Sequence, residues 1–491
     1  MFEPRNTLCV GALALGLSWL SGCASSLASG SARPAAAGQA APDEWSVAAP
    51  QPPVPSAADG GGSEGAASSA VAAEQAATEP SATPAPDVQQ RVVEATAASA
   101  TPQAALSTTN GAAAGASDDR YVDVVSEQGQ RARGLYINAP MAQRLGPTRL
   151  IKLVKDAGLD AVVIDVKDGT GRVSYDSQIP ELAGSRHIFL RDAPDYIKQL
   201  KAAGIYTIAR IVCFSDPVLP RAYPDRAILE NRPGHVGDIW EKNAHRNTWL
   251  DPYNEKNHEL FVSIAKEVEA IGFDELQLDY IRFPVDAATK FAVFPAYTDK
   301  PRQDVLIELL RRIDEAVHIP LGVDVFGVSA FHKGDPDGLG QVIEAWAKHV
   351  EVFSPMLYVR EMRQWMLQVK EGRAGVLVER GVKSMRDRLG PGPVIRPFLQ
   401  AFSSGADYYN PEFIAEQIRG ARSGGADGFL FWHSDSSYGM VRAGTTGPAR
   451  TAMPFPIDER KQAREVEWGT AKPAGEPAAV AREPRPAKPA S

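Results

Sequence analysis

The sequence of 491 residues predicts an α/β fold, a (β/α)8 barrel of the TIM-barrel type. Short runs rich in β-branched residues alternate with patterns of helical period between residues 134 and 433. There are eight such runs, and strands separated by helices imply parallel βαβ units. Three helical patterns end in a glycine before the next strand, at Gly158, Gly204 and Gly272, as helix C-caps do.

The expected strands are short and apolar, as the run Ala-Val-Val-Ile-Asp-Val-Lys at 161–167 illustrates. In order, they span residues 134–138, 161–167, 206–214, 275–280, 321–326, 352–358, 394–402 and 428–433. The expected helices span residues 148–157, 193–203, 255–271, 302–317, 340–349, 376–389 and 411–423. The segment 436–450 is rich in Gly, Thr and Pro, so we expect the eighth helix to be degenerate.

A doubly wound open sheet is the alternative architecture. Its nucleotide-binding members carry G-x-G-x-x-G after the first strand or the motif G-x-x-x-x-G-K-[ST], and the expected barrel contains neither motif. A run of about 320 residues also suits one large domain better than two small ones. The closed barrel is therefore the preferred prediction.

The composition divides the chain into four segments. Residues 1–22 predict an export signal, and residues 23–120 predict a disordered tether rich in Ala, Ser, Pro and Gly. Residues 121–455 hold the apolar runs of the barrel, and residues 456–491 predict a second disordered segment.

The end of the export signal, Leu20-Ser21-Gly22-Cys23, resembles the lipoprotein signals of bacteria. Small residues stand directly before Cys23, which predicts lipidation of that cysteine, although cleavage near Ala28 is the alternative. Several acyl chains would hold the protein at a membrane, since each buried methylene adds roughly 0.8 kcal/mol. Ala24 after the cysteine favours the outer membrane, so we expect a lipid-anchored envelope protein that faces the periplasm or the exterior.

Several classes of function lack support in the sequence. A net charge of −8 and the lack of Lys/Arg runs with interleaved aromatic residues argue against nucleic acid as a partner. The eight histidines show no H-x-x-H or H-E-x-x-H spacing, so we expect no metal and no cofactor. There is no G-x-S-x-G motif in the barrel, and Cys213 lies inside a strand, where we expect an inert thiol. We expect a monomer.

Polar residues recur late in the expected strands and on one parity, which in a barrel points them inward near the catalytic face. They are Asp165 and Lys167 in the second run, Arg210 in the third, Gln277 and Asp279 in the fourth, Asp324 in the fifth, Ser354 and Tyr358 in the sixth, Arg396 and Gln400 in the seventh, and Trp432 and His433 in the eighth. Burying so many charges is costly unless they pair or meet a ligand, so the set predicts a polar binding site. Asp165 with Lys167, and Asp279 with Arg282, could also be structural ion pairs.

Aromatic residues gather in the segments expected to form loops at that face. They are Trp240, Trp249, Tyr253, Tyr280, Phe283, Trp365 and Tyr438. Flat rings beside carboxylates and amides suit the apolar faces and hydroxyl edges of sugars. The stretch 216–252 is too long for an ordinary loop, and we interpret it as a lid or a wall of the site.

The segment Gln277-Leu278-Asp279-Tyr280-Ile281-Arg282-Phe283-Pro284 resembles a family of bacterial glycoside-hydrolase-like TIM barrels related to α-galactosidase-like barrels. Further matching pieces are Arg133-Gly134-Leu135-Tyr136, Val163-Ile164-Asp165-Val166-Lys167-Asp168, Asp251-Pro252-Tyr253-Asn254, Ser354-Pro355-Met356-Leu357-Tyr358, Ile395-Arg396-Pro397-Phe398-Leu399-Gln400 and Gly425-Ala426-Asp427-Gly428-Phe429. The resemblance implies a catalytic carboxylate at the end of strand four, the position of Asp279. The chain departs from the family after Tyr358, where it continues Val359-Arg360-Glu361-Met362.

Hydrolysis of a glycosidic bond uses two carboxyl groups, one ionised and one protonated. We expect Asp279 to be the nucleophile and Asp324 the acid/base, with Asp165 and Glu361 as alternatives for the acid. The expected substrate is a cell-envelope or extracellular polysaccharide, contacted by Asp165, Lys167, Arg210, Tyr253, Gln277, Arg282, Tyr358, Gln400 and Trp432. The rival hypotheses are a non-catalytic polysaccharide-binding lipoprotein and, third, a structural envelope lipoprotein.

Overall fold

The computed structural model describes residues 125–241, 248–285 and 287–453. The predicted signal, the tether, the tail and the lipidation site Cys23 lie outside these residues, and so does His245 of the long excursion. Cys213 is the free cysteine of the described part, and it is buried.

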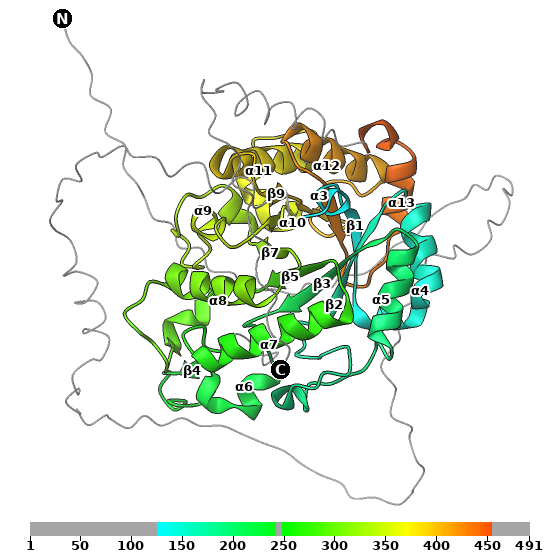
Figure 1. Ribbon diagram of the computed structural model, residues 1–491. Coiled ribbons are helices and arrows are strands. Elements are labelled where there is room, and N and C mark those ends of the chain that lie inside the picture. Colours follow the sequence, from blue (N-terminus) through cyan, green and yellow to red (C-terminus); the bar gives the residue numbers. More distant parts are fainter. Residues whose placement is uncertain (1–124, 242–247, 286, 454–491) are drawn as a thin grey trace, which may run out of the picture. The chain divides into compact units, whose positions relative to one another are not determined.

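The centre of the fold is a parallel sheet of nine strands in the order β10-β11-β1-β2-β3-β5-β7-β8-β9 (Figure 1). The strands are β1 (Arg133–Ile137), β2 (Ala161–Lys167), β3 (Tyr206–Val212), β5 (Glu275–Asp279), β7 (Leu321–Val325), β8 (Val352–Pro355), β9 (Val394–Ile395), β10 (Phe398–Gln400) and β11 (Phe429–Trp432). The two outer strands, β9 and β10, are consecutive pieces of the segment predicted as one strand at 394–402. Because β9 pairs with β8, Met356 bridges Phe398, and β10 pairs with β11, the sheet curls into the predicted eight-stranded barrel.

Helices cover the outside of the sheet: α4 and α5 beside β1 to β3, α7 beside β5, and α11 beside β9 (Figure 1). The helices between barrel strands are α4 (Ala139–Asp156), α5 (Ala193–Ala202), α7 (Glu255–Ile271), α8 (Arg302–Ala316), α9 (Ile343–Trp346), α11 (Arg373–Leu389) and α12 (Pro411–Ser423). The predicted bounds of α7 and α12 are confirmed, whereas α9 is shorter than the predicted helix 340–349. The eighth helix is short, α13 (Gly439–Thr446), as the composition of that segment indicated.

Local sequence signals explain where these helices begin and end. The Asn254 side chain accepts a hydrogen bond at the start of α7, and Gly272 ends the helix with a φ of 99°, which favours glycine. Residues 139–145 of α4 were missed because Gly146 and Pro147 indicate a break, and Gly146 is indeed non-helical at φ 63°. α11 and α12 pack closely where Gly375 meets Gly420, since a Cβ on Gly420 would lie 2.2 Å from the Gly375 carbonyl oxygen.

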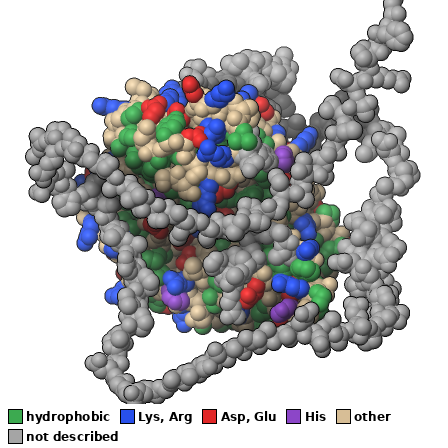
Figure 2. All heavy atoms as spheres, turned by 180° about the vertical axis from the view of Figure 1, so that it is seen from behind, with side chains coloured by type: hydrophobic (Ala, Val, Ile, Leu, Met, Phe, Trp, Pro, Cys, Tyr) green, Lys and Arg blue, Asp and Glu red, His purple; other side chains and the backbone are tan. Residues whose placement is uncertain are grey.

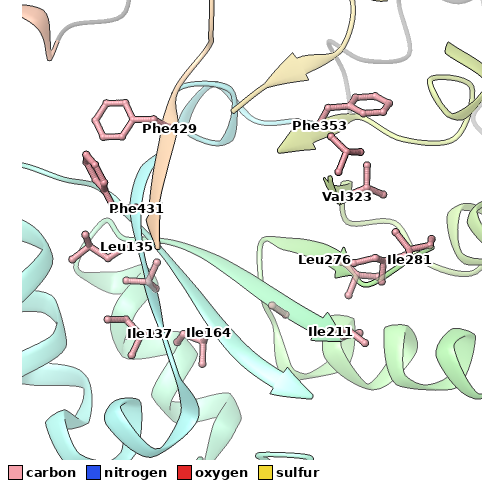
Figure 3. Packing of buried hydrophobic residues seen from close by; sticks show 14 of the residues in the cluster. Leu135, Ile137, Ile164, Ile211, Leu276, Ile281, Val323, Phe353, Phe429 and Phe431 are labelled. Atoms are coloured by element: carbon pink, nitrogen blue, oxygen red, sulfur yellow. The ribbon is translucent and has the colours of Figure 1, made fainter. Parts of the chain in front are cut away.

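Alternation along the strands separates two apolar layers. Outward-facing residues, including Leu135, Ile164, Ile211, Val323 and Phe431, pack between the sheet and the helices (Figure 3). Inward-facing residues form a second cluster inside the barrel, with Tyr136, Val163, Ile208, Phe398 and Leu430. The barrel is therefore a filled core, and its polar residues must find partners within it.

The lower interior of the barrel, by which we mean the end where β5 begins, contains a buried ion pair between Arg396 and Glu275. The Arg396 guanidinium donates to both Glu275 oxygens at 2.7 and 2.6 Å, and both side chains are fully buried. The Tyr206 hydroxyl donates to Glu275 at 3.1 Å. Arg396, which the sequence placed among the inward polar residues, thus has a structural role.

The excursion, which we define as residues 216–252, follows β3 and is described over residues 216–241 and 248–252. It contains α6 (Leu219–Ala222) and β4 (Leu229–Glu230), and β4 pairs with β6 (Ala292–Val293) from the segment after β5. The excursion returns to the barrel where Trp249 bridges Ser215. Two further short helices, α3 (Glu127–Gln130) and α10 (Val359–Met362), precede β1 and follow β8.

On the face shown in Figure 2, acidic and basic side chains are interspersed. Within residues 125–241, 248–285 and 287–453, no helix is both long and apolar enough to cross a membrane.

Candidate functional site

A single arginine, Arg210 of β3, holds three carboxylates from three other strands of the barrel. Its Nη1 lies 2.6 Å from Asp165 Oδ1, its Nη2 lies 2.5 Å from Asp279 Oδ2, and its Nε lies 3.7 Å from Asp324 Oδ2. Arg210 is 8 % exposed, Asp279 4 % and Asp324 1 %, so the group lies just beneath the strand ends. The structure thus brings together four of the residues that the strand parity singled out.

The hydrogen bonds are distributed unequally among the three carboxylates. Asp279 Oδ2 accepts from Arg210 Nη2 at 2.5 Å and from Nε at 3.1 Å, and Asp279 Oδ1 accepts from the Tyr280 backbone N–H at 2.6 Å. Hydrogen bonds of this kind stabilise a carboxylate in its ionised form. Asp279 is therefore the carboxylate best prepared to carry a negative charge.

Asp324 has the opposite environment. Both of its carboxyl oxygens are buried and have no hydrogen-bond partner among the described residues. Burial, followed by the negative charge of Asp279, raises the pKa of Asp324 well above its ordinary value. One cation cannot neutralise three carboxylates, so Asp324 is the member of the set that holds a proton most firmly.

Asp165 stands between these two extremes. Besides the Arg210 guanidinium, it accepts a hydrogen bond from the Tyr136 hydroxyl at 2.5 Å. Burial nevertheless raises the pKa of Asp165 above its ordinary value. The Arg210 guanidinium also lies 5.3 Å from the centre of the Tyr136 ring, so Tyr136 contacts both members of this pair.

The strand register explains why Asp279 and Asp324 are neighbours. Leu278 of β5 is in register with Val323 of β7, and the two aspartates follow these residues directly. Arg210 Nε contacts Asp279 Oδ2 at 3.1 Å and Asp324 Oδ2 at 3.7 Å, so these oxygens lie no further apart than the sum of the two distances. Both carboxyl groups therefore approach the same Arg210 nitrogen.

The residue after Asp279 has an uncommon backbone conformation. Tyr280 has a φ of 51°, in the left-handed region that non-glycine residues seldom occupy. Its ring lies 6.0 Å from that of Trp249, and the Arg282 guanidinium lies between 5.0 and 5.2 Å from the rings of Trp249, Tyr280 and Phe326. Strain at such a position is typical of functional sites, and here it aims the Tyr280 N–H at Asp279.

An aromatic group occupies the opposite part of the barrel mouth. Trp432 of β11 lies 6.1 Å from Tyr136, 5.8 Å from Tyr358 and 5.6 Å from Phe402, measured between ring centres. Tyr136 connects this group to the carboxylates through Asp165. The site therefore has a charged side and an aromatic side, which is the combination that sugar rings require.

Other predicted residues lie beside this site in supporting positions. Lys167 is fully buried and pairs with Asp216 at 2.7 Å, so the suggested pair with Asp165 is wrong. Gln277 donates to Ser354 at 3.0 Å within the barrel. The Gln400 carboxamide accepts from the Arg360 N–H and donates to two carbonyls of the loop after β10.

Asp279 has Arg210 as its cationic partner, whereas the sequence suggested Arg282. Arg282 donates to the Phe283 carbonyl at 3.0 Å and packs against the aromatic rings described above. Residue 282 lies beyond the end of β5, where the chain has already left the sheet. Spacing along the sequence therefore could not predict the direction of its side chain.

Four of the loop aromatics are buried packing residues, so they do not offer an exposed ring face to a sugar as the sequence predicted. Trp240, Trp249 and Phe283 are fully buried, and Tyr438 is nearly so. Tyr253 contacts Phe283 at 5.3 Å and Tyr297 at 5.2 Å, in a cluster between the excursion and the segment after β5. The side chain of Trp365 lies outside the described residues.

Two members of the site were missed by the sequence reasoning. Tyr136 stands late in β1 on the inward parity, so the rule that found the aspartates also applies to it. Phe402 ends the predicted strand 394–402 on the parity of Arg396 and Gln400, although β10 itself ends at Gln400. An aromatic residue at the end of a predicted strand was thus a usable signal in both cases.

Among the described residues, no group of three or more His, Cys, Asp or Glu side chains is arranged to hold a metal ion. Burial raises the pKa of the Cys213 thiol, which disfavours its thiolate form.

A polar pocket of about 500 Å³ lies in the excursion, where Arg221, Glu230 and Arg232 are among its lining residues. Their charges are paired with one another or with adjacent acids, as for Arg232 with Glu230 at 2.7 Å.

The barrel matches a known protein family. Residues 134–438 match the family model described as "Putative glycosyl hydrolase domain", which spans the barrel from β1 to the start of α13. No curated protein matches the chain.

Solved structures also resemble it. A hypothetical protein from Ruminiclostridium thermocellum is 31% identical over 39% of this chain and 97% of its own, with a TM-score of 0.34. The PgaB (BpsB) glycoside hydrolase domain from Bordetella bronchiseptica is 14% identical over 67% of this chain and 99% of its own, with a TM-score of 0.47. An α-galactosidase from Thermus thermophilus is 14% identical over 70% of this chain and 62% of its own, with a TM-score of 0.39.

Proposed function

The chain belongs to the family of glycosyl hydrolase domains that its barrel matches, and from this premise we propose that Asp279 and Asp324 cleave a glycosidic bond in a polysaccharide. The observation that carries the proposal is the unequal sharing of Arg210. Asp279 receives two N–H groups of that arginine and a backbone amide, while Asp324 receives no hydrogen bond from the described residues. Such a pair supplies one ionised and one protonated carboxyl group, as glycoside hydrolysis requires.

In the proposed reaction, an Asp279 carboxylate oxygen forms a bond to the anomeric carbon while the bond from that carbon to the leaving oxygen breaks. Asp324 gives its proton to the leaving oxygen and so becomes the anion. Water then attacks the glycosyl-enzyme, Asp324 recovers a proton from that water, and Asp279 is released. Arg210 and the Tyr280 N–H stabilise the carboxylate of Asp279 at the start and the end of this cycle.

We propose retention of configuration, because the Oδ2 atoms of Asp279 and Asp324 lie against the same arginine nitrogen. Retaining enzymes hold their carboxyl groups about 5–5.5 Å apart, and inverting enzymes about 6.5–9.5 Å apart to admit a water molecule. Both aspartates here contact one nitrogen, at 3.1 and 3.7 Å, which restricts the space for such a water. Proton NMR of the first product anomer distinguishes the two outcomes.

Glu361 is the alternative acid. It lies in α10, directly after β8, and its side chain is half-exposed, whereas Asp324 is buried. Burial raises the pKa of Glu361, which suits a proton donor. Loss of the true acid should hardly change the rate of cleavage of an activated aryl glycoside, whose leaving group needs no proton, but should strongly lower the rate with a poor leaving group. Comparing the rates of Asp324→Asn and Glu361→Gln on both substrates therefore assigns the role.

We further propose that Tyr358 and Trp432, with Tyr136, contact the sugar ring opposite the carboxylates. The ring separations of 5.8 and 6.1 Å support an aromatic surface formed by three different barrel segments. Lys167, Gln277, Arg282 and Gln400 would act by holding the strands and loops around the sugar. Tyr253 would stabilise the wall formed by the excursion.

The sequence at Cys23 supports a proposal about location. We place the protein in the cell envelope, anchored by lipid at Cys23 and facing the periplasm or the exterior, with a polysaccharide as its partner. Replacing Cys23→Ala should release the protein from the membrane fraction or leave an uncleaved precursor. Mature protein that remains membrane-bound in this variant would contradict the anchor.

The direct test of the reaction is a screen of envelope and extracellular polysaccharides with the full-length protein, scored by new reducing ends. Asp279→Asn is the matched variant, since it keeps the shape of the side chain and removes its charge. The proposal expects release of reducing ends from at least one glycan by the wild type and almost none by Asp279→Asn. Equal release by both proteins would move the chemistry away from Asp279.

A non-catalytic polysaccharide-binding role is the second candidate, and the near-complete burial of Asp279 and Asp324 favours it. A binding protein would retain glycan affinity without turnover, and Asp279→Asn would weaken that affinity. A hydrolase variant at Asp279 should instead keep its affinity while it loses turnover.

A further inference from the structure

The residue on the far side of Arg210 from Asp324 has no assigned role in the proposed reaction. We propose that Asp165, held by Tyr136, is a positioning residue that acts through Arg210 to keep the proton on Asp324. This inference rests on the proposed function for its relevance to catalysis, although its central measurement needs no substrate.

The first support is geometric. Asp165 Oδ1 accepts from Arg210 Nη1 at 2.6 Å, and its other oxygen accepts from the Tyr136 hydroxyl at 2.5 Å. Arg210 and Asp165 are also direct partners in the register between β3 and β2. Both oxygens of Asp165 are therefore occupied by protein groups, which suits a support for Arg210 better than a ligand for sugar.

The second support is the direction of the Arg210 side chain. With Nη1 directed to Asp165, the opposite edge of the guanidinium, Nε and Nη2, faces Asp279. Nε approaches Asp324 no closer than 3.7 Å, a distance beyond a hydrogen bond. Because the guanidinium is rigid and planar, fixing one edge fixes what the other edge can reach.

The third support is electrostatic. The groups that act on Asp324 come from all sides: Asp279 and Glu275 on β5, Arg210 on β3 and Asp165 on β2. Tyr358 after β8 and Cys213 after β3 are neutral groups that in turn sense the charge of Asp324. Arg210 is the cation of this set, and Asp165 opposes part of its charge while also repelling an anion at Asp324.

Removing the charge of Asp165 should therefore loosen the proton of Asp324. In Asp165→Asn, the amide oxygen still accepts from Arg210 Nη1, but more of the positive charge of Arg210 is available to an ionised Asp324. Asp324 should then lose its proton at a pH lower by about one unit or more, since a nearby charge commonly moves a carboxyl by 1–3 units.

The test is an NMR titration of the full-length protein with 13C-labelled aspartate carboxyl groups. The Asp324 resonance is identified as the one missing from Asp324→Asn, and its midpoint is compared between the wild type and Asp165→Asn. The matched control is Asp274→Asn, which removes an aspartate that pairs with Lys201 at the start of β5, away from the Arg210 cluster. The control should leave the Asp324 midpoint in place.

If Asp165→Asn does not fold, Tyr136→Phe tests the same arrangement. This variant keeps the ring but removes one of the two donors to Asp165, so the Asp165 midpoint should rise while that of Asp324 stays. An unchanged Asp324 midpoint in folded Asp165→Asn, or an unchanged Asp165 midpoint in Tyr136→Phe, would overturn the proposal.

Activity provides a separate readout once a substrate is known. The alkaline limb of the kcat/KM profile should move to lower pH in Asp165→Asn by the same amount as the NMR midpoint, because that limb reports the acid of the free enzyme. A residue with a merely structural role would lower the rate at every pH without moving the limb. A shifted midpoint in a protein that cleaves no glycan would reject the proposed hydrolysis and leave the assignment of Asp165 intact.

Discussion

Two arginines lie inside the same barrel, and they differ in the number of carboxylates that they contact. Arg396 in the lower interior meets one carboxylate, Glu275, and both are fully buried. Arg210 near the strand ends meets three carboxylates and leaves one of them without a hydrogen bond. Both groups carry a desolvation cost, and Arg396 keeps two buried nitrogens without a hydrogen-bond partner among the described residues, but the unbalanced set also keeps groups whose protonation a ligand can use. The imbalance, rather than the burial of charge, therefore separates site from scaffold.

The largest effect should come from the unbalanced set. Asp279→Asn should lower kcat on a glycan substrate by at least about a thousandfold, or about 4 kcal/mol of transition-state stabilisation, because the amide cannot form the glycosyl-enzyme. Thermal unfolding should change little, since Arg210 keeps Asp165 as a counter-ion in the variant. Steady-state kinetics and a melting curve on the same sample check both statements, and near wild-type turnover would contradict them.

Breaking the balanced pair should affect stability instead. Glu275→Gln leaves Arg396 charged and buried without a counter-ion, which should lower the free energy of unfolding by about 3–5 kcal/mol. Urea denaturation measures this loss. Replacing both partners, Glu275→Leu with Arg396→Met, should recover most of it, and a double variant as unstable as the single one would show that the pair itself is required.

Another buried carboxylate, Asp251, accepts hydrogen bonds from backbone N–H groups instead of an arginine and so extends the comparison. Its oxygens accept from the backbone N–H groups of Tyr253 and Ala296, both at 2.9 Å, and burial raises its pKa to about 6. The folded protein thus binds this proton more tightly than the unfolded chain, whose aspartates titrate near about 3.9. The contribution of Asp251 to stability is complete below about pH 4 and falls by about 3 kcal/mol as the pH rises to about 6 and above.

Asp251→Asn should remove that dependence on pH. The free energy of unfolding, measured in urea at pH 4 and pH 7, should fall less between the two values in the variant than in the wild type. Parallel curves for the two proteins would mean that Asp251 is ionised in the folded state throughout this range.

The smallest effect is expected where water surrounds the pair. Lys152 and Asp156 form an ion pair four residues apart on α4, with side chains 66% and 34% exposed. Asp156→Asn should change the free energy of unfolding by no more than about 0.5 kcal/mol, and less at high salt. A loss as large as that of Glu275→Gln would mean that exposure does not weaken ion pairs in this fold.

The sequence was sufficient to predict the barrel and the centre of its site. β2, α7 and α12 have the predicted bounds, because period and turn residues agree there, and parity selected Arg210 with its three aspartates. Parity failed at Lys167, since the pairing of β2 with β3 shifts register between Asp165 and Lys167, which directs Lys167 to Asp216. Parity does not apply to Tyr253 and Arg282, which lie outside the strands, where packing against other loops decides the direction of a side chain.

The division of the seventh strand was hidden for a different reason. Residues 394–402 are apolar apart from Arg396 and Gln400, and Pro397 within this run has no N–H to donate to a sheet. The chain therefore changes its neighbour in the sheet at Pro397. Before the proline, β9 pairs with β8, and after it, β10 pairs with β11. The proline was visible in the sequence, but the switch of neighbours depends on the closed sheet.

The pairing of β1 with β11 has a consequence for how the chain becomes folded. Arg133 is in register with Phe429, so the contact that closes the cylinder joins residues from the two ends of the domain. Until the last strand has left the ribosome, β1 exposes one edge of unpaired N–H and C=O groups, and that edge is open to association with other chains. Contacts between residues so distant along the sequence also form slowly. The final strand therefore closes the barrel by pairing with the first. A chain truncated before residue 429 should aggregate rather than fold into a shorter barrel.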